Sequence, residues 1–195
     1  MRDAINWRLN TIKNYKDYEK MTRKSKINYI ITGALIAALY AGLTYLSNIF
    51  GLAYGPIQLR VSEVLTILPV FTPAAIPGLT VGCFIANIGS FNMIDMIFGS
   101  FATLLAAVVT YLLRNVKFKG LPILAMLCPV IANAVIIGLE ITWFFMPDAS
   151  FLYGFLLSAF EVGISELVVC VGFGIPFYLV VKKYRIFERR FIKVM

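Results

Sequence analysis

Four glutamates lie in apolar stretches of this 195-residue sequence: Glu63, Glu140, Glu161 and Glu166. A charged group at the centre of a bilayer costs about 3 kcal/mol or more, so those that persist usually face a cavity or a partner. Arg60 is the one basic residue among these stretches, and a single guanidinium cannot neutralise four carboxylates. A cationic or donor-rich ligand, or protonation of some of the acids, would resolve the imbalance.

Other polar and aromatic residues accompany the glutamates. Arg60 and Glu63 are one helical turn apart, as are Glu140 and Trp143, so each pair shares a helix face. Asn87 and Asn133 lie in neighbouring apolar stretches. Trp143 could stack on a planar ligand, although an aromatic belt at the membrane interface explains it equally well. Asp95 and Asp148 are expected to be interfacial.

Apolar helices must position these residues. Hydrophobic residues make up 60% of the sequence and charged residues 14%, whereas a soluble domain has about 25% charged residues. Repeated apolar runs of about 20 residues suit a hydrocarbon core about 30 Å thick. We therefore expect an all-α integral membrane protein, a bundle of six transmembrane helices. The expected spans are residues 27–48, 59–71, 77–89, 93–113, 122–146 and 151–181.

The second and third spans are short and broken by proline. Such helices survive at membrane depth only where neighbours or a wet cavity satisfy their backbone groups.

Basic residues are confined almost entirely to three segments. Residues 1–26, 114–119 and 182–193 contain every lysine and arginine except Arg60. Basic residues that flank apolar spans indicate the cytoplasmic side more often than nucleic-acid binding. We expect a basic tail or amphipathic segment at 1–26, a membrane domain at 27–183 and a basic tail at 184–195, with both termini cytoplasmic. Every acid between 27 and 181 then lies in the outer half or on the outer surface.

Small residues repeat along the first span. Gly33, Ala34, Ala37, Ala38, Ala41 and Gly42 recur at four-residue spacing. Small side chains let another helix approach closely. On physical grounds alone, packing within the bundle and docking of an external partner explain this stripe equally well.

Motifs for several kinds of catalysis are missing from the sequence. It has no GxxxxGK[ST] phosphate loop, HExxH or GxSxG motif, and it contains no histidine, the commonest metal ligand. Its three cysteines are widely separated and lie in apolar stretches. We therefore expect neither an enzyme nor a resident metal or cofactor.

Four segments together resemble the QueT family. They read YGPIQLRVSEVLTILPVFTPAAIPGLTVGCFIANI, DMIFGSFATLLAAVVTYLLR, NAVIIGLEITW and VGISELVVCVGFGIP. These proteins are substrate-binding (S) components of energy-coupling factor (ECF) importers for queuosine precursors, in the plasma membrane of prokaryotes. The resemblance implies a six-helix bundle that works with a membrane scaffold protein and two ATPases. It also implies that the AxxxA pairs, Ala34 with Ala38 and Ala37 with Ala41, contact the scaffold.

The implied ligands are 7-cyano- and 7-aminomethyl-7-deazaguanine. A guanine-type edge presents two adjacent N–H donors to one carboxylate, and such charge-assisted bonds are short and strong. We expect Glu140 and Glu166 to be the main ligand carboxylates, with Glu63 placed by Arg60. Asn87 or Asn133 would serve the remaining polar atoms.

Stacking on the bicycle is expected from Trp143 or Phe98, and Glu161 completes the expected binding set. The alternatives are an S component for another vitamin-like ring compound, a stand-alone cation-coupled carrier in which glutamates relay cations, and a non-transporting membrane scaffold or sensor.

Overall fold

The computed structural model describes residues 2–53, 59–90, 92–148 and 150–187, with side chains from residue 23 onward. The described chain is helical, apart from loops and one isolated bridge between Phe118 and Leu121. The elements in order are α1 (Arg2–Ile49), η1 (Val61–Val70), α2 (Ala75–Ile88), α3 (Met93–Leu112), α4 (Ile123–Phe145), α5 (Phe151–Leu167), η2 (Val168–Phe173) and α6 (Gly174–Tyr184).

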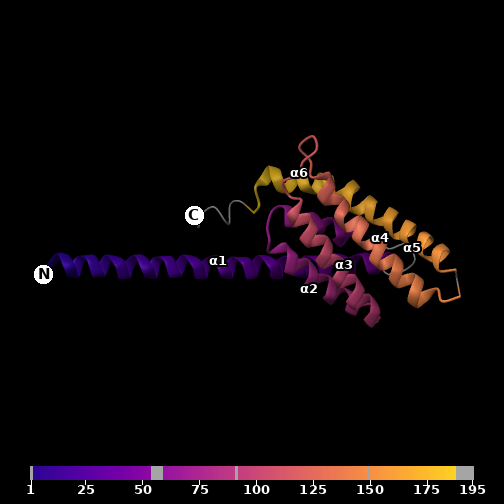
Figure 1. Ribbon diagram of the computed structural model, residues 1–195, viewed down its shortest axis with the longest axis horizontal. Helices are drawn as coiled ribbons and strands as arrows, with labels where there is room; N and C mark the ends of the chain where they lie inside the picture. The colour runs from indigo at the N-terminus through magenta and orange to yellow at the C-terminus, as the bar shows by residue number, and fades with distance from the viewer. Residues whose placement is uncertain (1, 54–58, 91, 149, 188–195) are drawn as a thin grey trace.

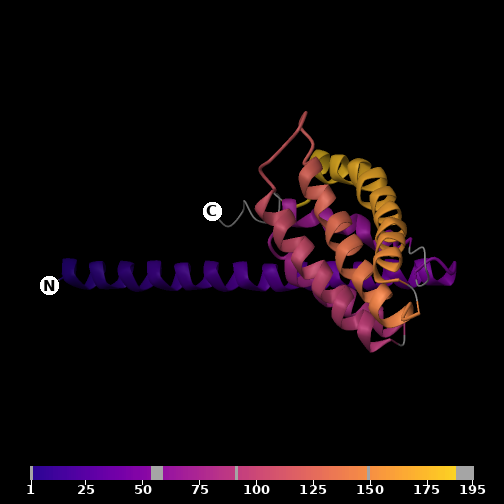
Figure 2. The same cartoon turned by 45° about the vertical axis from the view of Figure 1, so that its right-hand side comes forward.

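Helix α1 extends far beyond the bundle formed by the other elements (Figures 1 and 2). It runs unbroken from Arg2, so the expected N-terminal segment continues the helix of the first span. Most of the expected C-terminal tail lies outside the described residues.

Four helical segments are long and apolar enough to cross a membrane. They are residues 23–49, 93–112, 123–145 and 151–184, and they coincide closely with the expected first, fourth, fifth and sixth spans. The protein is therefore a multi-pass helical membrane protein. The 10 residues of η1 and the 14 of α2 would each be about 20 Å long, shorter than the core of a bilayer.

Helices α1 and α2 lie side by side because glycines let their backbones approach. A Cβ atom built on Gly78 would lie 2.7 Å from the carbonyl oxygen of Gly33, and one on Gly82 would lie 2.8 Å from that of Ala37. Small residues four apart are the usual means of such close packing in membranes. The order of these contacts along both helices makes α1 and α2 parallel, with η1 as the return segment between them.

The η1 segment is a 3-10 helix buried among the other elements. Seven of its ten residues are buried, including Glu63, and it contacts α1, α2, α3, α4, η2 and α6. Polar bonds join it to α1: the Thr44 hydroxyl donates to the Ser62 hydroxyl over 2.7 Å, and the Val61 amide donates to the Ser47 hydroxyl over 3.1 Å. A 3-10 run of this length is uncommon, and the surrounding helices supply the contacts that stabilise it.

The last membrane segment contains a π-helical turn. Helix α5 continues through η2 into α6 without a break, and the Gly174 amide donates to the carbonyl of Val169 five residues earlier. Pro176 explains the wider turn, because proline has no N–H to donate to the carbonyl of Gly172 and its ring would clash there. Such π-turns are frequent at functional sites.

Candidate functional site

Polar side chains from five elements converge on one cavity inside the bundle. The lining residues are Arg60, Glu63, Cys83, Asp95, Gly99, Thr103, Asn133, Ile137, Glu140, Val162 and Glu166. The cavity lies toward the end at which η1 and α3 begin and α4 ends. Its volume is about 20 Å³, which is room for about one water molecule. A bicyclic ligand could therefore enter only if the surrounding helices or loops move apart.

Glu140 is the carboxylate best prepared for a ligand. Helix α4 carries it, only 2% of its surface is exposed, and neither of its oxygens receives a hydrogen bond from the described part of the chain. Asp95 lines the same cavity and adds a carboxyl rather than a cation. Buried acceptors without donors are costly, so a ligand that brings two N–H groups would relieve that cost.

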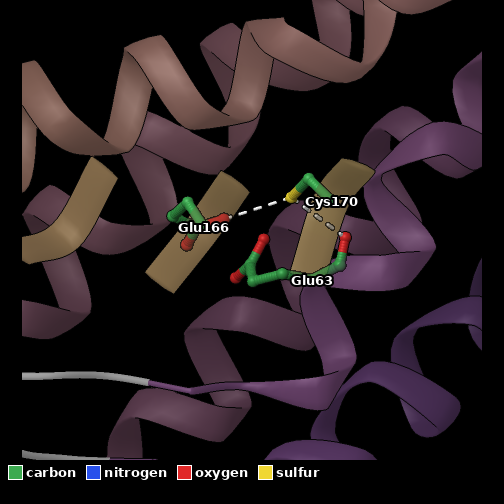
Figure 3. A group of neighbouring side chains, drawn as sticks. All are labelled: Glu63, Glu166 and Cys170. Carbon is green, nitrogen blue, oxygen red and sulfur yellow. Dashed lines mark hydrogen bonds between the residues drawn. The ribbon is translucent and has the colours of Figure 1, made fainter. Parts of the chain in front are cut away.

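Glu166 is already hydrogen-bonded at both oxygens. The Asn133 amide donates to Oε1 over 2.8 Å, and the Cys170 thiol is 3.2 Å from Oε2. Figure 3 shows Glu166 and Cys170 on neighbouring turns, with the Glu63 side chain reaching toward them from η1. The Cys170 sulfur also lies 3.6 Å from the Glu63 backbone carbonyl, so the thiol joins η2 to η1.

Three potential metal ligands come together beside the cavity. One ligand atom from each of Glu63, Glu166 and Cys170 lies within 4.8 Å of the others. However, both Glu166 oxygens and the thiol already take part in the hydrogen bonds just described, so this group forms a hydrogen-bonded cluster as it stands.

Glu63 and Arg60 are held by residues of α1, of the loop that follows it and of α2. The Tyr40 hydroxyl of α1 donates to Glu63 Oε1, while Glu63 Oε2 is buried and receives no hydrogen bond from the described residues. Arg60 donates through Nε to the Ala53 carbonyl and through Nη1 to Asn87 Oδ1, each over 3.0 Å. Asn87 thus serves as an anchor for Arg60 behind the cavity.

Five of the nine expected binding residues line the cavity, a sixth supports it from behind, and three lie elsewhere. Arg60, Glu63, Asn133, Glu140 and Glu166 line the cavity, and Asn87 supports it. Trp143 is 72% exposed and its ring contacts Phe151 edge-on. Phe98 contacts the Phe144 ring, and Glu161 is half-buried elsewhere on α5.

Several residues in or directly behind the cavity lining were not among the expected binding residues. Asp95 lines the cavity although an interfacial position was expected. Tyr40 is fully buried against Glu63, and Cys170 bonds to Glu166. The sequence contained one indication of a role for Tyr40: its hydroxyl lies on a face of the first span that is otherwise small and apolar. The contacts of Cys170 depend on the π-helical turn η2, which no sequence motif predicted.

The small-residue stripe of α1 divides into two faces. Ala37 and Ala41 are buried, with Ala37 against α2. Ala34 and Ala38 are exposed. Ala34 also lines an apolar groove with Tyr29, Pro77 and Val81. An external helix can therefore reach Ala34 and Ala38 without disturbing the bundle.

The fold and cavity together define a multi-pass membrane protein with a small internal cavity lined by buried carboxylates. The profile of the QueT transporter family matches residues 30–183, and the chain belongs to this family. The family is one of transporters, in agreement with the expectation that the chain is not an enzyme.

A relative from Lactococcus lactis subsp. cremoris (strain MG1363), named queuosine precursor transporter QueT, is 42% identical over 97 residues. The match covers 50% of this chain and 57% of the relative, so it spans less than two thirds of that protein. No solved structure matches the chain.

Proposed function

We propose that this protein is the substrate-binding component of an ATP-driven ECF importer and that it captures 7-cyano- or 7-aminomethyl-7-deazaguanine. The observation that carries the proposal is the buried Glu140 carboxylate, which faces the cavity and receives no hydrogen bond from the described residues. Its two oxygens suit the paired N–H donors of a guanine-type edge. Family membership and the name of the relative support the class of ligand.

The remaining cavity groups suit the rest of such a ligand. Arg60 is the cation in the lining, and it would donate to the ring carbonyl. Glu63 Oε2 has no donor among the described residues, and one carboxylate oxygen of Glu63 lies within 4.8 Å of one of Glu166. These two carboxylates would hold the positive charge of an aminomethyl group.

The proposed topology is six crossings with both termini in the cytoplasm of a prokaryotic cell. The functional unit is the membrane domain of residues 27–183, and the basic segments 1–26 and 184–195 lie on the inner side. The cavity then opens toward the outside. Ligand binding involves no catalysis by this chain: a scaffold protein docked on Ala34 and Ala38 re-orients the bundle, and two ATPase subunits supply the energy.

Direct binding to the purified full-length protein tests the proposal. In lipid nanodiscs, Glu140→Gln should raise the dissociation constant for both 7-deazaguanines at least tenfold, which corresponds to about 1.4 kcal/mol. Glu161→Gln is the matched control because Glu161 lies outside the cavity lining, and it should change affinity less than twofold. Unchanged binding by the Glu140 variant, or equal losses in both variants, would refute the assigned site.

The two ligands distinguish the roles of the carboxylates. Glu63→Gln should weaken binding of the cationic aminomethyl form more than binding of the neutral cyano form, because only the cationic form is attracted by the charge of a carboxylate. Equal weakening of both forms would place the substituent elsewhere in the cavity. Transport is tested separately: uptake into vesicles should require the scaffold and ATPases, and uptake by this chain alone would contradict the importer mechanism.

A further inference from the structure

A second pocket lies at the opposite end of the bundle from the carboxylate cavity. It has a volume of about 260 Å³ and forms where the end of η1, the loop between α3 and α4, and the end of α6 meet. Four cationic residues line it: Arg114, Lys117, Lys182 and Arg185. No aspartate or glutamate within the described ranges does so.

The walls of this basic pocket are aromatic and aliphatic. Phe71 packs against Tyr178 with ring centroids 5.2 Å apart and against Phe187 at 6.1 Å, and all three rings line the pocket. Arg185 ends α6 in the left-handed conformation, with φ of 48°. The chain turns there, which brings Phe187 back onto η1. The pocket therefore combines a cationic rim with an apolar wall.

Some of the cations are positioned by aromatic contacts. The Arg114 guanidinium lies 4.0 Å above the Tyr111 ring, and its Nη1 donates to the Tyr111 carbonyl over 2.9 Å. The Lys182 ammonium lies 5.8 Å from the centre of the Tyr178 ring. Such contacts reduce the number of positions each side chain samples, and this favours a defined anion site over a diffuse charged surface.

The depth of the pocket indicates what it binds. The candidate spans that contain α3 and α6 end at Leu112 and Tyr184, which would place the cations at the level of lipid headgroups and the rings just below them. Basic pockets between membrane helices bind anionic headgroups in this way. An anionic phospholipid offers a phosphate for the rim and an acyl chain for the wall, whereas a soluble acidic peptide or a free phosphate would leave the apolar wall unused.

We propose that this pocket binds the phosphate headgroup of an anionic phospholipid, with the adjoining glycerol and acyl carbons against Phe71, Tyr178 and Phe187. This site is separate from the carboxylate cavity, so the lipid proposal does not depend on the proposed transport function.

The test is titration of the purified full-length protein with phosphatidylglycerol, with bound lipid counted by native mass spectrometry and phosphatidylcholine as the zwitterionic reference. The variant is K117Q/K182Q/R185Q. The matched control is R23Q/K24Q/K26Q, which removes the same charges from exposed positions on α1 away from the pocket. The proposal requires that phosphatidylglycerol bind the wild type and the control at least tenfold more tightly than it binds the pocket variant.

Equal loss in the control would show a general charge effect and overturn the proposal. Inorganic phosphate that displaced phosphatidylglycerol at equal concentration would overturn the lipid as the ligand. Folding is checked by melting in phosphatidylcholine nanodiscs. If the triple variant melts early, the single change K117Q in the exposed loop replaces it, and unchanged lipid affinity in that variant would also count against the site.

Discussion

The close contact between α1 and α2 can be tested by making the same glycine-to-alanine change at two positions, Gly82 and Gly42, for which different stabilities are expected. A Cβ atom on Gly82 would lie 2.8 Å from the Ala37 carbonyl oxygen, 2.9 Å from Tyr40 Cβ and 3.0 Å from Ala37 Cα. Two of these atoms belong to the α1 backbone, so Gly82→Ala must push the helices apart by several tenths of an ångström. A Cβ on Gly42 would meet nothing within 4 Å, so Gly42→Ala is the matched control.

The expected magnitude follows from two terms. Alanine is better than glycine in a helix by about 1 kcal/mol, and this gain is common to both variants. Overpacking costs about 1–3 kcal/mol and applies to Gly82 alone. The two alanine variants should therefore differ by about 1–3 kcal/mol. For a chain of this size each kcal/mol corresponds to about 2–4 °C in melting temperature.

The assay is thermal unfolding of both variants and the wild type in the same nanodiscs. Gly42→Ala should melt at or above the wild type, and Gly82→Ala should melt below Gly42→Ala. Ligand affinity should also fall in the Gly82 variant, because Tyr40 moves together with its hydrogen bond to Glu63. A Gly82 variant as stable as the Gly42 variant would refute the close helix contact on which this reasoning depends.

Three further predictions concern the cavity and the outer face of α1. Glu140→Gln should stabilise the ligand-free protein by about 1 kcal/mol in thermal melting, because it replaces a buried carboxyl that receives no hydrogen bond with an amide that brings its own N–H donors beside Asp95; a lower melting temperature would indicate that Glu140 has a partner. Tyr40→Phe should weaken ligand binding about fivefold, since loss of one hydrogen bond costs about 1 kcal/mol, and unchanged titration curves would contradict a role for Glu63. The double change A34L/A38L should abolish co-purification with the scaffold while leaving ligand affinity unchanged, and normal co-purification would remove the proposed docking face.

The sequence predicted that polar residues from different helices lie at a similar depth, and Glu63, Glu140 and Glu166 do line one cavity. The sequence did not predict the direction in which each side chain points around its helix. Direction depends on which neighbours pack against a helix. Trp143 follows Glu140 by three residues, which places it about 60° away around the helix. That angle is enough to carry Trp143 from the interior to a position with 72% exposure.

Helical spacing alone could have separated two of the expected residues. Glu161 and Glu166 are five residues apart, which is about 140° around an α-helix, so both could not face one small cavity. The structure places only Glu166 in the lining. Asp95 was harder to place, because it begins α3 near a membrane surface. Its inward position depends on the turn after α2, where the Asn87 amide donates to the Asp95 carbonyl over 3.0 Å.

Two irregular helical segments, η1 and η2, lie at or beside the cavity. Local sequence patterns specify their backbone conformation only weakly. Glu63 and Glu166 come from segments far apart in the chain, and the Cys170 thiol of η2 contacts the backbone carbonyl of Glu63 and the carboxylate of Glu166. A 3-10 turn at Glu63 and a π-turn after Glu166 change the direction of neighbouring side chains relative to regular α-helices. Prolines mark both segments, Pro69 within η1 and Pro176 just after η2. Proline predicts that a helix will be disturbed, but only packing against the surrounding helices decides whether it kinks, tightens or widens. In this protein Glu63 lies within one disturbed segment and Glu166 lies two residues before the other, so the irregular backbone borders the carboxylate cavity.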